Sequence, residues 1–164
     1  MNVVAFKEKV GGIDEFRDSS AFICVQKLTR HHLKFSDPEN YQILWLEDGV
    51  GSIDADYEKR ESFPFTILFI YPGKEVTLRF NCFQPKGWII KLPRLFFKQH
   101  MEGFNIQHAI FFSDKIPGIV LSPKIGDRIN SLAEMINEIM HSDIPNKEVG
   151  SSSLLKSLLI YCDS

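Results

Sequence analysis

The sequence predicts a mainly β fold, a small antiparallel barrel or jelly roll, with a pair of α-helices after it. Short apolar runs rich in β-branched and aromatic residues occupy 41–47, 65–71, 75–82 and 87–91. Gly or Pro-Gly punctuates these runs every ten to twenty residues, a pattern typical of small all-β architectures. After Pro117 the apolar spacing changes to that of a helix, which predicts helices in the remainder.

The elements around these runs follow from weaker patterns. Residues 21–28 are apolar and predict a first strand, while 29–40 are polar and contain a turn signal, Asp37-Pro38-Glu39-Asn40. Residues 52–60 alternate weakly between apolar and polar side chains, so we expect an exposed strand there. A stretch over 93–101 with proline at its start predicts a short helix or turn.

Two helices are predicted in the last quarter of the sequence. The first, over 124–141, carries apolar residues spaced 4-3-4-3 along one face: Ile125, Ile129, Leu132, Ile136 and Ile139. Ser122 is its expected N-cap, and Pro123 occupies the first helical position. A polar segment over 142–153 predicts a linker, and a Leu-rich second helix is expected over 151–163.

Composition excludes several classes of protein. With 164 residues, 44% hydrophobic and 24% charged, the chain is expected to be one globular domain, or one domain with an appendage. A net charge of −2 lacks the basic footprint of a nucleic-acid-binding surface. No stretch approaches the roughly 20 apolar residues of a membrane span, and charges near the N-terminus do not fit a signal peptide. Three widely spaced cysteines form no disulfide framework, so we expect a cytoplasmic protein with reduced thiols.

No catalytic residue, cofactor or metal is predicted. His31 and His32 are adjacent, so on a strand their side chains would point to opposite faces and could not bind one ion. The sequence has no Gly-x-Ser-x-Gly nucleophile motif. Asp54, Asp56 and Glu58 share one face of an expected edge strand, where acids more often discourage aggregation between strands than bind a cation.

Four side chains on the barrel strands are candidates for a small-ligand site, which we expect in the barrel interior. Trp45 and Trp88 could supply flat stacking surfaces, and Gln42 or Arg79 could supply hydrogen bonds. A small barrel has room for one ligand when side chains do not fill its interior. The alternative is that both tryptophans belong to the apolar core and that Arg79 faces solvent. The sequence does not decide between them, because it does not identify the inner face.

Three strand motifs occur in an order that is similar to that of a known protein family. Residues 41–49 read YQILWLEDG, 65–73 read FTILFIYPG and 87–91 read GWIIK, and two predicted helices follow. Over roughly residues 35–164, this order resembles the N-terminal cupin domain of AraC-type bacterial transcription regulators. Metal-binding cupins use a His-x-His pair, a Glu and a later His, and this sequence lacks that set.

The resemblance implies a sensor and dimerisation domain that is not an enzyme. Residues 1–116 would form a barrel that binds a small-molecule effector, and 117–164 would form a helical dimerisation segment. DNA binding would belong to a helix-turn-helix unit that this chain does not contain. The alternatives are a cupin-fold enzyme, such as an isomerase or dioxygenase, and a free-standing cupin that binds a small ligand.

The helical segment also has two interpretations. In the AraC family the helices after the barrel form the dimer interface, which implies a homodimer contact through Ile125, Ile129, Leu132, Ile136, Ile139, Leu155 and Leu158. However, an amphipathic helix normally packs on its own domain, and this stripe spans only about two heptads.

Overall fold

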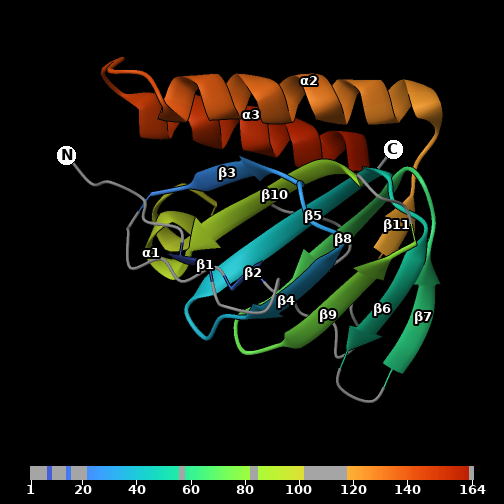
Figure 1. Ribbon diagram of the computed structural model, residues 1–164. Helices are drawn as coiled ribbons and strands as arrows, with labels where there is room; N and C mark the ends of the chain where they lie inside the picture. The colour runs from blue at the N-terminus through green and yellow to red at the C-terminus, as the bar shows by residue number, and fades with distance from the viewer. Residues whose placement is uncertain are drawn as a thin grey trace.

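The computed structural model describes residues 7–8, 14–15, 22–55, 58–81, 85–101 and 118–162. In this part of the chain, two β-sheets face each other as a cupin-like barrel, and two helices lie together over the outer face of one sheet (Figure 1). The predicted fold class, mainly β with a C-terminal helical pair, is confirmed. Among the described helices, none combines the length and the apolar character needed to span a membrane.

The first sheet, sheet A, has six strands in the described residues. In spatial order they are β1 (Lys7–Glu8), β2 (Asp14–Glu15), β4 (His32–Ser36), β9 (Glu75–Phe80), β6 (Gly51–Ala55) and β7 (Glu58–Ser62). β2 and β4 pair in parallel, and the other neighbours pair antiparallel. Sheet A therefore joins strands that are far apart in the sequence.

The second sheet, sheet B, has five strands in the described residues and is antiparallel throughout. In spatial order they are β11 (Gly118–Val120), β8 (Thr66–Ile70), β5 (Asn40–Asp48), β10 (Lys86–Pro93) and β3 (Cys24–Lys27). The register of β5 on β10 sets Trp45 opposite Trp88 and Gln42 opposite Lys91. The helix α1 (Arg94–Phe96) and a π-helical turn, η1 (Phe97–Met101), follow β10, as the sequence predicts.

Apolar side chains fill the space between the two sheets. They alternate along the strands, as Leu44 and Leu46 do on β5 and Leu33 and Phe35 do on β4. The whole inner cluster comprises Leu28, Leu33, Phe35, Leu44, Leu46, Ile53, Ala55, Leu68, Ile70, Val76, Leu78, Phe80 and Ile89. Much of the barrel interior is therefore packed core.

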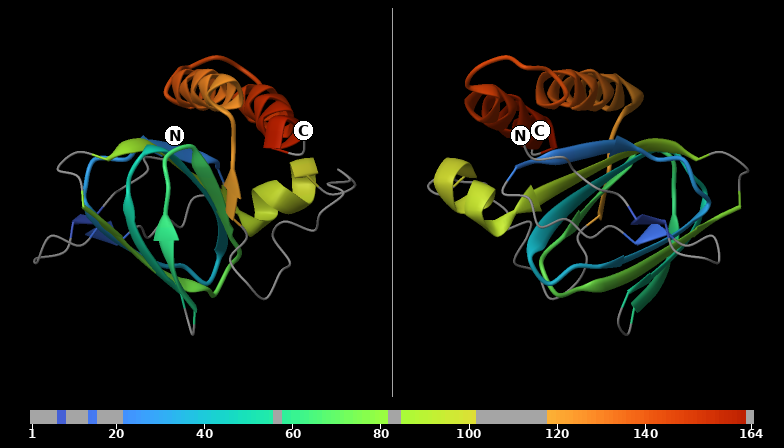
Figure 2. Two further views of the ribbon diagram at one scale, coloured as in Figure 1. Left: turned by 90° about the vertical axis from the view of Figure 1, so that its right-hand side faces the viewer. Right: turned by 60° about the vertical axis from the view of Figure 1, so that its left-hand side comes forward.

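A second apolar cluster fills the space between sheet B and the helices. Trp45 and Trp88 belong to it, and so do Ile129 and Ile136 of the helix α2 (Pro123–Met140). Figure 2 shows this layering from two further sides, with the helices stacked on one wall of the barrel. Because both faces of sheet B are covered, β5 and β8 read as continuous apolar runs rather than as alternating ones.

Both predicted helices form, and the first has its predicted cap. α2 begins after Ser122, whose Oγ accepts a hydrogen bond from the backbone N–H of Ile125 at 3.3 Å. The second helix, α3 (Lys147–Cys162), begins earlier than the expected 151. The hydroxyls of Ser152 and Ser153 donate to the carbonyl of Val149 at 2.8 and 3.1 Å. The serines expected at the helix start therefore sit inside the helix, bonded back to the preceding turn.

Three segments of the sheets differ from the sequence-based expectation. The single exposed strand expected at 52–60 is the hairpin of β6 and β7, so Asp54 lies on an inner strand of sheet A rather than at its edge. The polar segment 29–40 contains β4, whose two buried apolar residues are separated by charged and polar neighbours. β11 pairs with β8 beyond residue 116, so sheet B extends to Val120 before the helices begin.

Close contact between α2 and sheet B depends on Gly126. A Cβ at this position would lie 2.8 Å from Cδ1 of Phe65, and 3.1 and 3.2 Å from Cζ2 and Cη2 of Trp45. Phe65 has a φ of 58°, a backbone conformation that is costly for a bulky residue. Its ring centroid lies 6.2 Å from that of Trp45. The missing side chain at Gly126 lets the start of α2 rest on these two rings.

We expect Gly126→Ala to destabilise the fold by about 1–3 kcal/mol, because an added methyl group would force the Phe65 ring to shift and would crowd the buried ring of Trp45. Gly150→Ala in α3 is the matched control, since the atom nearest to its new Cβ would be Ile139 Cδ1 at 3.8 Å. The control should stabilise the chain by about 0.5–1 kcal/mol through helix propensity. Urea unfolding followed by circular dichroism measures both, and equal effects would contradict the close docking of α2.

Candidate functional site

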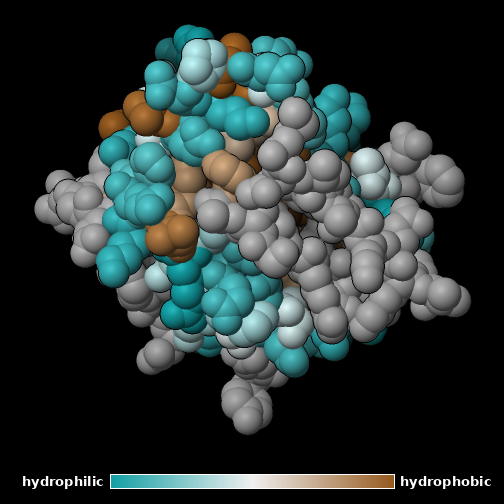
Figure 3. All heavy atoms as spheres, turned by 90° about the vertical axis from the view of Figure 1, so that its left-hand side faces the viewer, coloured by the Kyte–Doolittle hydropathy of each residue, from teal (hydrophilic) through white to brown (hydrophobic). Residues whose placement is uncertain are grey.

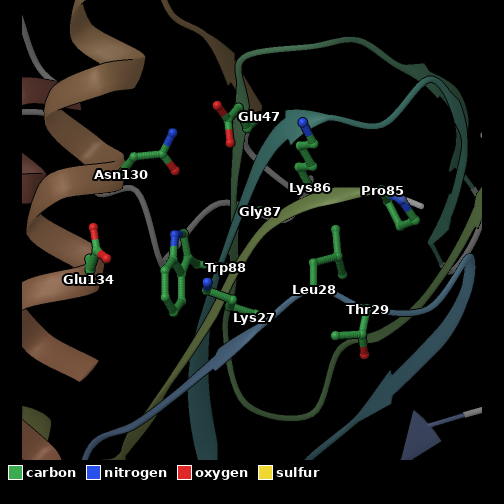
Figure 4. Close-up of a pocket in the computed structure, with 10 residues that line it drawn as sticks. All are labelled: Lys27, Leu28, Thr29, Glu47, Pro85, Lys86, Gly87, Trp88, Asn130 and Glu134. Atoms are coloured by element: carbon green, nitrogen blue, oxygen red, sulfur yellow. The ribbon is translucent and has the colours of Figure 1, made fainter. Parts of the chain in front are cut away.

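A surface cleft of about 600 Å³ opens where α2 passes the ends of β3, β5 and β10 (Figure 4). Clefts of this size accommodate small molecules. The lining residues come from these strands, the loops beside them and α2: Lys27, Leu28, Thr29, Glu47, Pro85, Lys86, Gly87, Trp88, Asn130 and Glu134. We call this site the helix–sheet cleft.

The Trp88 indole lines the helix–sheet cleft between α2 and the strands (Figure 4). The Nζ atom of Lys27 lies 5.4 Å from the centroid of that ring, a cation–π contact worth about 0.5–1 kcal/mol at an exposed site. The pairing of β10 with β5 is irregular between Lys86 and Gly87. Only glycine fits there, because a Cβ at Gly87 would lie 1.8 Å from the carbonyl oxygen of Trp45.

From α2, the cleft receives Asn130, whose orientation is fixed by the sheet beneath it. Trp45 Nε1 donates a hydrogen bond to Asn130 Oδ1 at 2.9 Å. An indole N–H can only donate, so the amide oxygen of Asn130 must face Trp45. The amide NH₂ group is then left to donate elsewhere, and Asn130 lines the cleft. The buried tryptophan thus holds a hydrogen-bond donor ready for an occupant.

Charges of both signs surround the same space. Lys27 and Lys86 project from the strand side, and Glu134 projects from α2 (Figure 4). Glu47, near the end of β5, adds a second carboxylate. Within the residues that the structure describes, no ion pair joins a lysine of the cleft to one of its glutamates. The cleft can therefore receive a molecule that carries both a positive and a negative group.

A separate polar cluster lies inside the barrel, at the other end of β5. Asp37 accepts hydrogen bonds from the backbone N–H groups of Glu39 and Asn40 at 2.9 and 3.1 Å, which confirms the predicted turn. It also accepts one from Asn40 Nδ2 at 2.6 Å. Lys91 Nζ lies 3.3 Å from Asp37 Oδ2, with both side chains buried. Gln42 Nε2 is buried nearby on the same face of sheet B and has no hydrogen-bond partner among the described residues.

The four predicted ligand residues do not form one site. Gln42 points into the barrel, as expected, whereas Trp45 and Trp88 lie on the opposite face of sheet B, beneath α2. Arg79 is exposed on β9 of sheet A. The expected interior location was therefore wrong for three of the four. Alternation places residues on two faces, but both faces of sheet B are buried, so the pattern cannot identify the inner one.

The predicted dimer residues fall into two groups, one fully buried and one partly buried. Ile129, Ile136, Leu155 and Leu158 are 0% exposed within a single chain, so they offer no surface to a second copy. As a dimer contact these four are corrected to core residues. The remaining members of the stripe are only partly buried: Ile125, Leu132 and Ile139. The stripe serves first to attach α2 to its own domain.

Sequence reasoning missed the residues that α2 and β3 bring to the cleft. Asn130 directly follows Ile129 and lies at the margin of the apolar stripe. A polar residue at that margin was the available signal of a polar contact beside the sheet. Lys91 was likewise visible as a single charge within the apolar run of β10. In the described part of the chain, no group of three or more His, Cys, Asp or Glu side chains could hold a metal ion.

Comparison of the sequence with protein-family models and with curated proteins finds no match. Solved structures do match. The AraC-like transcriptional activator CuxR gives a TM-score of 0.51 at 10% identity, over 85% of this chain and 52% of CuxR. An apo variant of ToxT from Vibrio cholerae gives 0.55 at 8% identity, over 85% of this chain and 54% of ToxT. Over 85% of its length, the chain shares its fold with about half of CuxR and of ToxT.

A cupin protein from Bacteroides fragilis also matches, at 22% identity over 44% of this chain and 64% of its own, with a TM-score of 0.35. The present chain spans about half the length of CuxR and of ToxT. The likeness to CuxR and ToxT confirms the fold that the resemblance of the three strand motifs implied.

We expect Asp37→Asn to destabilise the chain by about 3–5 kcal/mol, because it removes the negative charge that lies 3.3 Å from the buried Lys91 ammonium. Lys91→Met should cost less, about 1–2 kcal/mol, since Asp37 keeps its three hydrogen bonds from Glu39 and Asn40. The double variant should be more stable than Asp37→Asn alone. Urea unfolding of the three variants gives this cycle, and additive effects would contradict a direct coupling of the pair.

Proposed function

We propose that this chain is the effector-sensing and dimerisation domain of an AraC-type transcriptional regulator. The observation that carries this proposal is the shared fold, which covers 85% of this chain, barrel and helical pair included, in the matches to CuxR and to ToxT. In this function the chain catalyses no reaction and needs no cofactor. It binds a small molecule and passes the effect to a DNA-binding unit outside this sequence, in the cytoplasm.

The contact between α2 and sheet B supports a route for that effect. Asn130 of α2 accepts a hydrogen bond from Trp45 of β5, and the missing side chain at Gly126 leaves room for the same ring. An occupant that favours one position of α2 on the sheet would shift the population of helical-pair arrangements. A coupling of roughly 1–3 kcal/mol is enough for a typical switch.

The helical pair also offers apolar surface for a second copy of the chain. Several of the large exposed apolar side chains lie on α2, α3 or the turn between them: Met135, Ile144, Val149 and Ile160. Figure 3 shows apolar side chains at the surface on the upper part of one face, where the helices lie. A two-fold symmetric dimer is the commonest form of self-association, and two helical pairs could meet in such a contact. We propose that these exposed residues, rather than the buried stripe, make the dimer.

A reporter experiment tests the sensing function. The chain is fused to the DNA-binding unit of an AraC-like regulator, and transcription from a promoter with that unit's paired sites is measured. The fusion should regulate the promoter more strongly than the unit alone, and added small molecules should change its output. A fusion that behaves as the unit alone does, under every addition, would refute the sensing function.

We expect Ile160→Glu to give a folded monomer where the wild-type chain is a dimer, because Ile160 is 60% exposed and a charge there would be buried only on association. Val50→Glu is the matched control, since Val50 is 46% exposed in the turn between β5 and β6. The control should remain a dimer. Light scattering at micromolar concentration measures the mass, and circular dichroism checks the β-sheet signal.

A monomeric wild-type chain under these conditions would contradict the dimer. Ile136→Asp is not an informative variant here, because Ile136 is fully buried in its own chain. A charge at that position should unfold the domain whether or not it dimerises.

A further inference from the structure

We propose that the helix–sheet cleft, rather than the barrel interior, is the effector site, and that it binds a small zwitterion with a planar ring, as in an aromatic amino acid. This inference rests on the proposed function and names its site and ligand class. The cleft has the volume for such a molecule, about 600 Å³. The inner face of sheet B, in contrast, packs against apolar side chains of sheet A.

The ring of the ligand is expected to lie on Trp88. In the structure Trp88 lines the cleft and is only 6% exposed, with the Lys27 ammonium 5.4 Å from its ring centroid. Lys27 is exposed at the end of β3, an edge strand of sheet B in the described residues. A long and exposed side chain can swing aside at little cost and leave the ring to a planar molecule. Aromatic rings stack in offset geometry on such a surface.

The charges of the cleft select a ligand with both signs. A carboxylate would be met by Lys27, by Lys86 and by the NH₂ group of Asn130 that Trp45 orients. An ammonium group would be met by Glu134 on α2 and by Glu47 on β5. A ligand with only one of these groups would be repelled by the protein charges of its own sign without a second group to compensate for that repulsion. That cost discriminates against purely anionic and purely cationic molecules.

The position of the cleft explains how its occupancy would reach the helices. One wall is α2, and the other wall is the ends of three strands of sheet B (Figure 4). A zwitterion bound to both walls therefore bridges the helix and the sheet. Asn130 would touch the ligand with its NH₂ group and Trp45 with its oxygen, so occupancy acts on the same contact that holds α2 in place.

Direct binding tests the ligand class. The probes are L-phenylalanine, L-tyrosine and L-tryptophan, with 3-phenylpropionate and phenethylamine as analogues of phenylalanine that lack the ammonium and the carboxylate. Calorimetry measures all five. The fluorescence of the chain's two tryptophans, Trp45 and Trp88, reports the phenylalanine series from beside the cleft. At least one amino acid should bind saturably, and phenylalanine should bind roughly 10-fold more tightly than either analogue.

Two pairs of variants test the location. Lys27→Met and Glu134→Gln should each weaken binding roughly 10-fold, since each removes one charge partner of the ligand. Lys34→Met on β4 and Glu138→Gln, one turn further along α2, are exposed and lie outside the cleft. These controls should leave the affinity unchanged. Equal losses in cleft and control variants, equal binding of an analogue, or no binding of any amino acid would each overturn the inference.

The reporter fusion separates this inference from the proposed function. If an added small molecule changes transcription equally in the wild type and in Lys27→Met and Glu134→Gln, the effector binds elsewhere. The inference then fails while the sensing function stands. If an amino acid binds the cleft with the predicted variant pattern but no addition changes transcription, the cleft assignment holds and the sensing function fails.

Discussion

Burial of sheet B on both of its faces is the constraint on which the rest of the structure depends. One face closes the barrel against sheet A, and the other carries α2 and α3. Neither the sheet nor the helical pair could keep its apolar side chains from water alone, because each supplies the other's cover. The two tryptophans are the largest residues of this shared layer, and they connect the barrel to the helices rather than lining the barrel.

The helix is held on the sheet by contacts of two kinds. Gly126 gives a close steric fit against Phe65 and Trp45, and Asn130 gives a directed hydrogen bond from Trp45. Packing fixes the distance between helix and sheet, whereas the hydrogen bond fixes the rotation of one polar side chain at the surface. A small molecule at this border therefore acts on the junction of the two halves of the domain. In the barrel interior it would first have to displace packed core.

The two polar clusters of the domain differ in how far their groups are satisfied. Asp37 is buried, forms an ion pair with Lys91 and accepts hydrogen bonds from a turn, so its carboxylate is satisfied within the fold, although Gln42 Nε2 beside it has no hydrogen-bond partner among the described residues. The charged residues of the helix–sheet cleft are accessible and are not paired across it in the described residues. Buried and satisfied groups stabilise one structure, while accessible groups that converge without pairing can be satisfied by a ligand.

The sequence by itself determined the features that depend on neighbours along the chain. The strands of β5, β8, β9 and β10, the turn at Asp37 and the cap at Ser122 all follow from local patterns, and so did the fold class. The start of α3 also depends on local contacts, but it was predicted too late in the sequence. Serine hydroxyls can either cap a helix or bond back to its carbonyls, so the serines did not identify the first residue of the helix. The burial of Ile129 and Ile136 followed from their spacing, although the spacing did not name what would cover them.

Only the tertiary structure decided which face of sheet B is inside and where a ligand can bind. Alternation along a strand assigns side chains to two faces, but it cannot tell which face points into the barrel when both faces are apolar. The positions of Trp45 and Trp88 therefore could not be predicted from β5 and β10 alone. The helix–sheet cleft joins Lys27, Trp88 and Asn130, which come from three segments far apart in the sequence. Their convergence results from strand order and from the docking of α2, and these long-range contacts leave no periodic signal in the chain.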